Sequence, residues 1–407
     1  MKILMINHFP LEGSGSGTYT KNLATQLAKH GHEVCVILPE NTPDFPHYEG
    51  IRIHPVHFTD PLHPEAATSE AVDFNFPCFT THPRSTTSFA DLSDQQLEQY
   101  CTAFQEAIDF EIESFSPDVI HGQHVWILPS LACDHGVPLV LTAHGTDLMG
   151  YEKWPHLHAF ADRAIEDCEK VICISEDNEE LVRATFPEQA HKIVRRRNGY
   201  NPDIFKVEDI DREAVLADHG VDARDRNVIL FAGKMTRFKG IDVLLDAAAI
   251  YEKDLPNAIT VLAGDGEERE ALERQARELG LGRVFFIGNV SQSELARLYN
   301  SADVSVVPSR REPFGLVAVE AMACGTPVVA TDQGGLPDFV DREVGELVEP
   351  EDATDLARGI EETLERALTD KDWRKRIAAY AESNYSQEVI LQELVDLYES
   401  VGLVGHR

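Results

Sequence analysis

Short apolar runs alternate with amphipathic segments along most of the chain, which is typical of a parallel sheet covered by helices. The first apolar run, at 3–7, is followed by a glycine-rich turn, a helical pattern at 19–30 and a second apolar run at 33–38. Further apolar runs predict buried strands at 119–121, 139–142 and 171–174. We therefore predict a doubly wound α/β domain in the first half.

The same alternation begins again in the second half. Apolar runs predict strands at 228–232, 259–263, 284–287, 304–307 and 328–330. The segments between them predict helices at 241–252, 267–279, 292–300 and 316–323. Because a turn-rich stretch at 198–202 separates the halves, we expect two tandem Rossmann-like domains, 1–197 and 198–385.

Two segments stand outside this alternation. Residues 41–93 are polar and contain several prolines, so no element is assigned there, whereas an acidic helix is predicted at 94–115. An amphipathic helix is also predicted at 387–400. We expect the terminal segment 386–407 to pack back across the first domain.

Composition limits the class of protein. A length of 407 residues favours two domains, and the absence of an eighteen-residue apolar run predicts no transmembrane segment. Met1 leads directly into an apolar run without a cleavage site, which predicts a cytoplasmic protein. The 7 cysteines contain no C-x-x-C pair and predict reduced thiols without a zinc site. Nothing in the sequence indicates an oligomeric state.

The chain is strongly acidic, with 36 basic against 70 acidic residues and a formal net charge of −34. Nucleic acid is therefore excluded as an expected partner, because phosphate backbones require a basic face. The acids are spread along the chain, as in halophile-like proteins adapted to a salt-rich cytoplasm. An ordinary acidic protein has the same composition, so both interpretations stay open.

The motif from Glu312 to Glu320 has one carboxylate on each side of a loop-to-helix junction. Pro313 and Gly315 interrupt regular structure, and a helix is predicted from Leu316. The free N–H groups of its first turn favour an anion such as a phosphate, and the carboxylates are suited to hydroxyl donors. A nucleotide sugar has this combination of groups. An ordinary helix start with one solvated glutamate fits equally well.

A cationic loop, which contains Lys234, Arg237 and Lys239, follows the predicted strand 228–232. Ligands bind at the carboxyl ends of parallel strands, and fixed cations stabilise the charge of a departing diphosphate. A solvated basic loop is the alternative interpretation.

His144 and Asp147 follow the predicted strand 139–142. A histidine there can donate a hydrogen bond to a sugar hydroxyl or carbonyl, and Asp147 can orient it or the loop. A capped turn histidine is the alternative. His121 and His124 have no matched third ligand in the sequence, so no metal site is predicted.

Other glycine-containing turns also follow predicted strands. The turn at 13–18 contains Gly15 and precedes a helix, where main-chain N–H groups can bind a phosphate or a second substrate that accepts a transferred group. Gly264, Asn289 and Val290 lie in turns whose main-chain groups can read a base. Ordinary βα turns explain these stretches as well.

Along the chain, the motifs follow the order of the glycine-rich turn at 13–18, the motif 144–147, the turn 198–199, the cationic loop 233–240, the turn 264–266 and the motif 312–320. In this order they resemble the retaining GT-B glycosyltransferases of family 4 over nearly the whole chain except 41–93. The resemblance implies an α/β GT-B fold with two Rossmann-like domains and a cleft between them. It also implies that the C-terminal domain binds a nucleotide sugar and the N-terminal domain binds the acceptor.

The resemblance implies residue roles as well. Lys234 and Lys239 would bind the diphosphate, Glu312 and His144 the sugar, and Glu320 the ribose. The family commonly has arginine where this chain has Lys234, and Arg237 can compensate for the lost bidentate geometry. Residues assigned to catalysis are His144, Lys234, Lys239 and Glu312. Residues assigned to donor binding are Gly15, Asp147, Arg237, Gly264, Asn289, Val290, Pro313, Phe314, Gly315, Leu316 and Glu320.

The implied reaction moves a hexose to an acceptor hydroxyl with retention of anomeric configuration. A UDP-sugar is preferred over GDP-mannose as the donor, and residues 41–93 would select the unidentified acceptor. No cofactor is expected, because the cationic loop can replace a metal's charge; Mg²⁺ is compatible with the site but is not predicted.

Three other functions are compatible with parts of the sequence. An epimerase of the same fold would turn over a nucleotide sugar without an acceptor. A non-catalytic sensor would bind a nucleotide sugar without turnover. A nicotinamide-dependent dehydrogenase is disfavoured, because the opening loop lacks the third glycine of the dinucleotide fingerprint.

Overall fold

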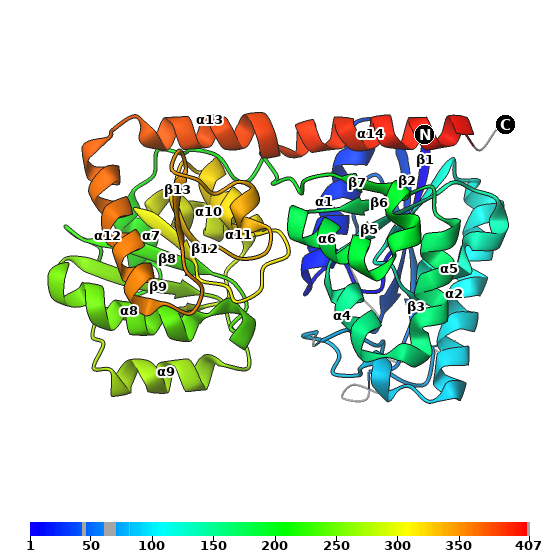
Figure 1. Cartoon of the computed structure of the whole chain (residues 1–407), viewed down its shortest axis with the longest axis horizontal. Helices are drawn as coiled ribbons and strands as arrows, with labels where there is room; N and C mark the ends of the chain where they lie inside the picture. The colour runs from blue at the N-terminus through cyan, green and yellow to red at the C-terminus, as the bar shows by residue number, and fades with distance from the viewer. Residues whose placement is uncertain (43–45, 61–70, 81, 405–407) are drawn as a thin grey trace. The chain divides into compact units, whose positions relative to one another are not determined.

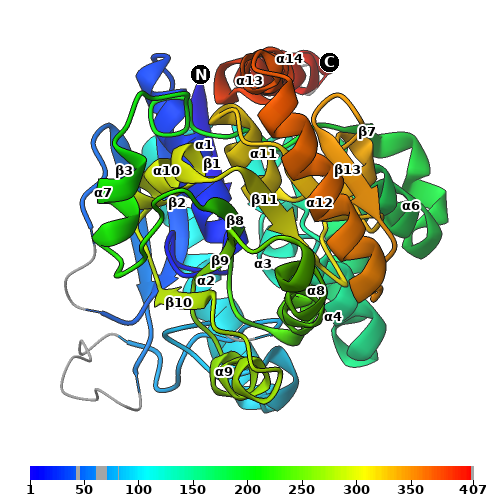
Figure 2. The same ribbon diagram turned by 90° about the vertical axis from the view of Figure 1, so that its left-hand side faces the viewer.

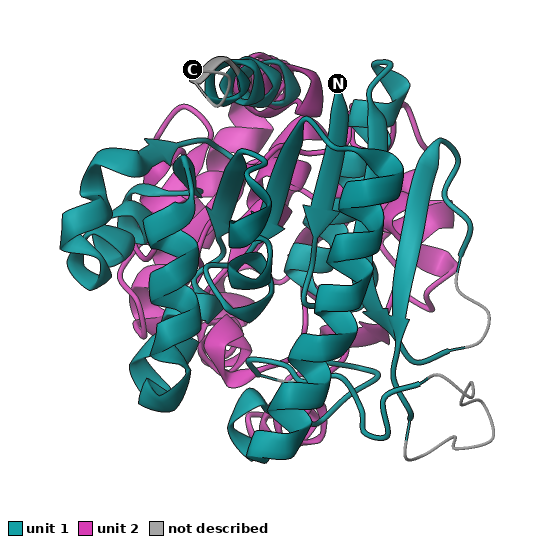
Figure 3. Ribbon diagram, turned by 90° about the vertical axis from the view of Figure 1, so that its right-hand side faces the viewer, with its two compact units in different colours: residues 1–197, 391–407 teal, residues 198–390 magenta. Residues whose placement is uncertain are grey.

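The computed structural model describes residues 1–42, 46–60, 71–80 and 82–404. The chain forms two compact units (Figure 3). Unit 1 contains Met1–Arg197 together with Leu391–Arg407, and unit 2 contains Asn198–Ile390. Each unit is built around a parallel sheet with helices on both faces (Figure 1), which confirms the predicted α/β architecture.

The sheet of unit 1 has seven strands in the order β3-β2-β1-β4-β5-β6-β7. All neighbouring strands pair in parallel. The order reverses between β1 and β4, which is a topological switch point of the kind where ligands bind. The strands are β1 (Lys2–Ile6), β2 (Glu33–Glu40), β3 (Ile51–His57), β4 (Val119–Gln123), β5 (Leu139–Ala143), β6 (Lys170–Cys173) and β7 (Ile193–Arg195).

Helices cover both faces of this sheet. Successive residues of β1 point to opposite faces, so Leu4 and Ile6 join one hydrophobic cluster while Ile3 and Met5 join another. The α-helices of unit 1 are α1 (Gly15–Lys29), α2 (Asp94–Phe115), α3 (Ile127–Leu131), α4 (Thr146–Lys153), α5 (His158–Asp167), α6 (Glu176–Thr185) and the greater part of α14 (Gln387–Val404).

Helix α1 begins four residues earlier than the predicted start at 19. Ser14 is its N-cap, because the Ser14 hydroxyl accepts a hydrogen bond from Gly17 N at 3.0 Å. A side chain on Gly17 would overlap the carbonyl oxygen of Pro10. Of the three glycines that suggested a turn, Gly15 and Gly17 therefore lie in the first turn of the helix, whereas Gly13 precedes its N-cap.

The segment without a predicted element supplies both an edge strand and part of the core. Strand β3 pairs with β2, and the following loops bury Phe74, Phe76, Phe79 and Phe89. Short isolated bridges connect these loops, and their aromatic side chains pack with the helices on one face of the sheet. Aromatic packing therefore holds the described loops that follow β3.

The sheet of unit 2 has six parallel strands in the order β10-β9-β8-β11-β12-β13. Its order reverses between β8 and β11, which makes a second switch point. The strands are β8 (Asn227–Ala232), β9 (Ala258–Ala263), β10 (Val284–Gly288), β11 (Val304–Val307), β12 (Val328–Thr331) and β13 (Gly345–Val348).

Two groups of helices cover the faces of this second sheet. Helices α8 and α12 lie side by side (Figure 2) and bury apolar residues in a cluster shared with α9. Helix α11 contacts α10 and α13. The helices are α7 (Arg212–Ala217), α8 (Ile241–Asp254), α9 (Arg269–Glu278), α10 (Gln292–Ser301), α11 (Leu316–Ala323), α12 (Ala353–Thr369) and α13 (Trp373–Tyr385).

Helix α14 runs from the end of unit 2 into unit 1. Leu391, Leu394 and Tyr398 are buried in the cluster that contains Ile3 and Met5. The Tyr398 hydroxyl lies 2.6 Å from His121 Nδ1 on β4, so polar as well as apolar contacts anchor the helix to unit 1. No helix within the described residues is long and apolar enough to cross a membrane.

Candidate active-site residues in the two units

The cationic loop of unit 2 connects β8 to α8 and contains a short 3₁₀ turn at Arg237–Lys239. Gly240 ends this turn at φ 64°, and a side chain there would overlap the carbonyl oxygen of Pro308. The absence of a side chain at Gly240 lets the loop approach the segment that follows β11. Two loops that are far apart in the sequence thereby meet at the carboxyl edge of the sheet.

This approach brings Lys239 and Glu312 together. Lys239 Nζ lies 2.6 Å from Glu312 Oε2, and the Ser309 hydroxyl donates to the same oxygen at 3.1 Å. Glu312 is buried, whereas Lys239 is partly exposed. A cation and a carboxylate from two different motifs therefore form one partly buried ion pair, whose interaction is stronger than that of a solvated pair.

The main chain around Glu312 is held closely. Its carbonyl oxygen accepts a hydrogen bond from Gly335 N at 2.9 Å, and a side chain on Gly334 would overlap that oxygen. Gly315 has φ 104° and is the N-cap of α11, where no side chain caps the helix. The first N–H groups of α11 therefore remain suited to an anion beside the Lys239–Glu312 pair.

Arg310 joins the two loops and was missed by the sequence analysis. Its guanidinium forms two 2.7 Å hydrogen bonds to the Asp242 carboxylate and a 2.9 Å bond to the Arg237 carbonyl oxygen. It also pairs with Glu351. This bidentate geometry fixes the start of α8 against the loop that carries Glu312. The adjacent arginines 310 and 311 before Glu312 were the available sequence signal.

Lys234 and Arg237 are exposed on the cationic loop. The neighbouring turns join this loop through the main chain: Gly233 N donates to Ala263 O at 3.0 Å, and Gly264 N donates to Gly288 O at 2.7 Å. The predicted base-reading residues Gly264, Asn289 and Val290 therefore lie in turns along the same sheet edge as the cationic loop.

The remaining residues of the glutamate motif differ in their surroundings. Phe314 is buried, with its ring centroid 5.3 Å from that of Phe339, so its side chain packs in the core. Pro313 and Leu316 are partly buried. Glu320 is also partly buried, and desolvation raises its pKa to about 8. Its carboxyl group is therefore largely protonated at neutral pH.

In unit 1, His144 follows β5 and is buried. Its Nε2 donates to Gln123 Oε1 at 2.9 Å, which leaves Nδ1 as the acceptor nitrogen. Burial lowers the pKa of His144 to about 3, so the ring is neutral. With Nε2 engaged by Gln123, Nδ1 is the nitrogen left to meet a ligand, and the contact of His144 with a sugar stays a prediction.

Gln123 is a second residue that the sequence analysis missed. It ends β4, and its side chain is fully buried against His144. Its amide nitrogen has no hydrogen-bond partner among the described residues. A buried donor without a partner is costly, and a water molecule or a ligand oxygen placed beside it would remove that cost.

Asp147 is fully buried in the first turn of α4 and binds main-chain groups. Its carboxylate accepts from Val125 N at 2.8 Å and from His144 N at 3.2 Å. Burial raises its pKa to about 6, although main-chain N–H groups oppose this shift. Of its two predicted orienting roles, the structure displays the one on the loop, because Asp147 fixes the backbone at His144.

Two other histidines lie near His144 in unit 1. His121 bonds to Tyr398 through Nδ1 and to Thr142 through Nε2, at 2.6 and 2.7 Å. His124 is buried at φ 79°, and its ring centroid lies 4.8 Å from that of His144. No group of three metal-binding side chains occurs within the described residues.

Gly15 is the first residue of α1 and is exposed. A side chain at this position would meet no atom within 4 Å, so the main chain there is open to solvent. The Tyr19 ring, one turn further along α1, lies 5.3 Å from the His144 ring. The glycine-rich turn and His144 therefore share one edge of the unit 1 sheet.

Comparison with known proteins gives matches along nearly the whole chain. Residues 14–199 match the glycosyl transferase 4-like domain, and residues 217–383 match the glycosyl transferases group 1. An uncharacterized glycosyltransferase of Methanocaldococcus jannaschii is 31% identical over 98% of both chains. The D-inositol 3-phosphate glycosyltransferase of Corynebacterium jeikeium is 30% identical over 100% of this chain and 98% of that one.

Solved structures with a similar fold also cover nearly the whole chain. Sucrose-phosphate synthase from Thermosynechococcus elongatus matches with a TM-score of 0.76 and 24% identity, over 99% of this chain and 100% of that chain. Anabaena HepE in complex with UDP and glucose matches with a TM-score of 0.73 and 21% identity, over 98% and 100%. At 24% and 21% identity, these structural matches show a shared fold and nothing further.

Proposed function

The chain belongs to the group 1 glycosyltransferases and has the GT-B fold, and we propose that it moves a hexose from a nucleotide sugar to an acceptor hydroxyl with retention of configuration. The observation that carries this proposal is the Lys239–Glu312 ion pair beside the start of α11. A diphosphate can take over Lys239, which releases Glu312 to accept hydrogen bonds from sugar hydroxyls. A nucleotide sugar carries both a diphosphate and sugar hydroxyls, so it supplies a partner for Lys239 and for Glu312 at once.

The donor roles in unit 2 follow from this exchange. Lys239 binds the diphosphate, and the exposed Lys234 and Arg237 add positive charge on the same loop. The first turn of α11 supplies main-chain N–H groups to phosphate oxygens. Glu320 accepts the ribose hydroxyls once its carboxyl loses its proton.

The reaction breaks the bond between the anomeric carbon and the phosphate oxygen and forms a bond to the acceptor oxygen on the same face. The acceptor's proton passes to the leaving phosphate oxygen. Negative charge grows on the diphosphate, so the cations of the loop stabilise the transition state more than the bound donor. In unit 1, we assign the neutral His144 a contact with the transferred sugar through Nδ1.

We propose a UDP-sugar as donor, with GDP-mannose as the alternative. The complex of Anabaena HepE with UDP and glucose supports a uridine nucleotide in a protein of this fold. No metal is proposed, because Lys234, Arg237 and Lys239 supply the positive charge. Activity that survives EDTA would support this assignment, and activity that depends on added Mg²⁺ would overturn it. The cytoplasm stays the proposed location.

The test is a transfer assay with purified protein. UDP-glucose, UDP-N-acetylglucosamine and GDP-mannose are each offered with a broad panel of hydroxyl acceptors, and the anomeric configuration of the product is read by NMR. We expect transfer with retention, and we expect Glu312→Ala to lose it. Absence of transfer from all donors, together with normal donor binding by Glu312→Ala, would overturn the proposal.

The same purified protein also distinguishes a glycosyltransferase from an epimerase and from a non-catalytic sensor. An epimerase would release an epimer or free UDP without any acceptor, and a sensor would bind the nucleotide sugar without turnover. Donor binding is measured as a rise in melting temperature, because a ligand of the native state stabilises it. The measurement at low and high salt also tests the halophile-like composition, since screening should stabilise a chain of net charge −34.

A further inference from the structure

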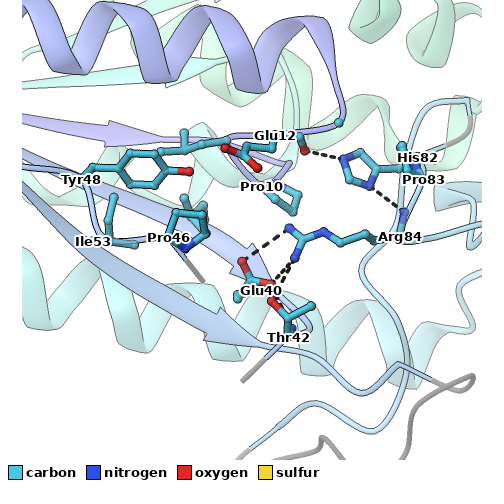
Figure 4. A pocket seen from close by; sticks show the side chains of 13 residues that line it. Pro10, Glu12, Glu40, Thr42, Pro46, Tyr48, Ile53, His82, Pro83 and Arg84 are labelled. Atoms are coloured by element: carbon cyan, nitrogen blue, oxygen red, sulfur yellow. Dashed lines mark hydrogen bonds and ion pairs between the residues drawn. The ribbon is translucent and has the colours of Figure 1, made fainter. Parts of the chain in front are cut away.

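Unit 1 contains a pocket that no motif of the sequence predicted. It has a volume of about 420 Å³, within the range of about 300–1,000 Å³ that is usual for small-molecule sites. The pocket lies where β1 and β2 end (Figure 4). Its walls come from four parts of unit 1: the loop 10–13, residues 38–42, residues 46–53 and residues 82–84.

The pocket has mixed walls. Leu38, Ile53 and several prolines supply apolar surface. The Tyr48 hydroxyl points toward the space beside Pro10 and Pro46 (Figure 4). Polar side-chain atoms of the lining come from Glu12, Glu40, Thr42, Tyr48, His82 and Arg84. Apolar surface with a few placed polar groups is suited to a sugar, which has an apolar C–H face and a rim of hydroxyls.

Arg84 lies in the wall of the pocket, and its positive charge is already paired with a carboxylate. Arg84 forms an ion pair with Glu40 through Nη1, and Arg84 Nη2 lies 3.4 Å from Glu40 Oε2. Glu40 is buried and also accepts from Asn41 N at 2.8 Å and from Thr42 N at 2.9 Å. Arg84 holds Glu40 through both Nη atoms, whereas Lys239 holds Glu312 through one nitrogen. No ligand hydroxyl is assigned to replace Arg84 at Glu40, so withdrawal of Arg84 toward another anion would leave this buried carboxylate without its counter-charge.

The nearby cation Lys21 is paired as well. Lys21 Nζ lies 2.9 Å from Glu12 Oε1 and 5.3 Å from the centre of the Tyr48 ring. Desolvation and the negative charge of the neighbouring Glu12 raise the pKa of Tyr48 to about 12, so its hydroxyl keeps its proton. Arg84 and Lys21 are therefore each paired with one carboxylate, Glu40 and Glu12 respectively.

His82 adds no positive charge. Its Nδ1 accepts a hydrogen bond from Arg84 N at 3.1 Å, and its Nε2 donates to Glu12 O at 3.0 Å. Because Nδ1 is an acceptor, the ring is neutral. A side chain on Gly13 would approach His82 Nε2 to 2.7 Å, so the glycine permits this contact.

We propose that this pocket binds the acceptor and that the acceptor is a neutral polyhydroxylated molecule, such as a sugar or a polyol, in preference to its phosphorylated form. This inference rests on the proposed glycosyl transfer. Hydroxyl groups can donate to Glu12 and to the oxygen of Tyr48, whereas a phosphate would meet two carboxylates whose cations are already engaged.

The first test compares matched acceptors on the full-length protein. Glucose is compared with glucose 6-phosphate, and myo-inositol with D-inositol 3-phosphate, with release of UDP from UDP-glucose as the readout. We expect kcat/KM to be at least tenfold higher for the neutral member of a pair. A preference for the phosphorylated member, or use of neither member by an enzyme that hydrolyses the donor, would overturn the inference.

The second test fills the pocket. Pro83 is exposed in its wall, so Pro83→Trp should raise the KM for the neutral acceptor at least tenfold. Pro187→Trp is the control, because Pro187 is an exposed proline of unit 1 outside the pocket. An unchanged acceptor KM in Pro83→Trp would contradict the assignment of this pocket.

The third test changes the charge balance. Glu12→Gln removes the partner of Lys21, so the kcat/KM ratio should shift at least threefold toward the phosphorylated acceptor. An unchanged ratio would contradict the electrostatic part of the proposal. UDP-induced stabilisation and slow donor hydrolysis are measured without acceptor in every variant. Their absence from the wild-type protein would overturn the proposed function itself, whereas their presence with failure of the pocket tests would overturn this inference alone.

Discussion

The two units use the carboxyl edges of similar sheets in different ways. The candidate groups of unit 1 are neutral or bound to main chain: His144 is an uncharged ring, and Asp147 accepts from two main-chain N–H groups. The candidate groups of unit 2 are charged side chains paired with each other, as in Lys239 and Glu312. The candidate groups of unit 1 are therefore fixed without charge pairing, whereas under the proposed function a ligand of unit 2 would exchange with an ion pair.

This difference has a consequence for binding. Release of Lys239 from Glu312 loses one partly buried ion pair, and a doubly charged diphosphate compensates for that loss more fully than a single carboxylate. No comparable exchange is required around His144. We therefore expect substitutions in unit 2 to change donor binding and transfer most, and substitutions in unit 1 to act through orientation.

The largest effect is expected for Lys239→Ala. Loss of a fixed cation beside the leaving diphosphate should lower kcat/KM for transfer by about 10²–10³. The matched control is Lys253→Ala, because Lys253 is an exposed lysine in the last turn of α8. Steady-state kinetics with a UDP-sugar check this prediction, and equal losses in both variants would contradict a specific role for Lys239.

A smaller loss is expected for Arg310→Ala. Arg310 connects the start of α8 to the loop before Glu312, so its removal should misplace both loops and lower kcat by about tenfold. Arg358→Ala is the control, since Arg358 makes exposed pairs within α12. A positioning role predicts partial rescue by Arg310→Lys. If Arg310→Ala lowers only the melting temperature, the residue stabilises the fold without positioning the site.

Asp147 allows a pH test of the candidate groups in unit 1. Its pKa is raised to about 6, so it becomes protonated as the pH falls through 6 and then holds the His144 backbone less well. We expect kcat/KM to decline severalfold below pH 6 in the wild-type protein. Asp147→Asn should have lower activity and lack this decline. If kcat/KM of Asp147→Asn still declines below pH 6 as in the wild type, the decline is caused by the titration of another group.

Glu320 gives the smallest expected effect and concerns stability. Desolvation raises its folded pKa to about 8, above the ordinary value of 4.5, so the folded state binds more protons between these values. Its contribution to stability is therefore highest below pH 4.5 and is lost as the pH rises through 8. Glu320→Gln should be near neutral at pH 5 and stabilising by about 2 kcal/mol at pH 8.5.

Thermal unfolding of the wild type and Glu320→Gln at both pH values measures this difference. The stabilisation corresponds to a rise of a few degrees in Tm for a chain of this size. Glu382→Gln on α13 serves as an exposed control. A pH-independent difference would contradict the raised pKa of Glu320.

The fold could be predicted from the sequence where the hydrophobic pattern is regular. Helix α2 and strand β11 have the predicted bounds, because α2 repeats its apolar positions with the helical period and β11 is a short buried run, Val-Ser-Val-Val. The segment 41–93 could not be assigned, and its described residues after β3 are held by aromatic contacts and isolated bridges that have no local period. The early start of α1 was missed because its first turn contains two glycines.

The candidate site was predictable as motifs and not as contacts. Lys239 and Glu312 could be selected individually, but their pairing depends on the close approach of Gly240 to Pro308. Arg310 was missed because its partner Asp242 lies 68 residues away in the sequence. Tertiary proximity of this kind has no signal in one sequence.

The central claim is that Lys239 passes from Glu312 to the diphosphate of the donor. Calorimetric titration with UDP tests it most directly, using the wild-type protein, Lys239→Ala and Glu312→Gln. The account predicts that Lys239→Ala weakens UDP binding at least tenfold, whereas Glu312→Gln, which removes the competing carboxylate, binds UDP at least as tightly as the wild type. Equal UDP affinity in Lys239→Ala and the wild type would contradict it.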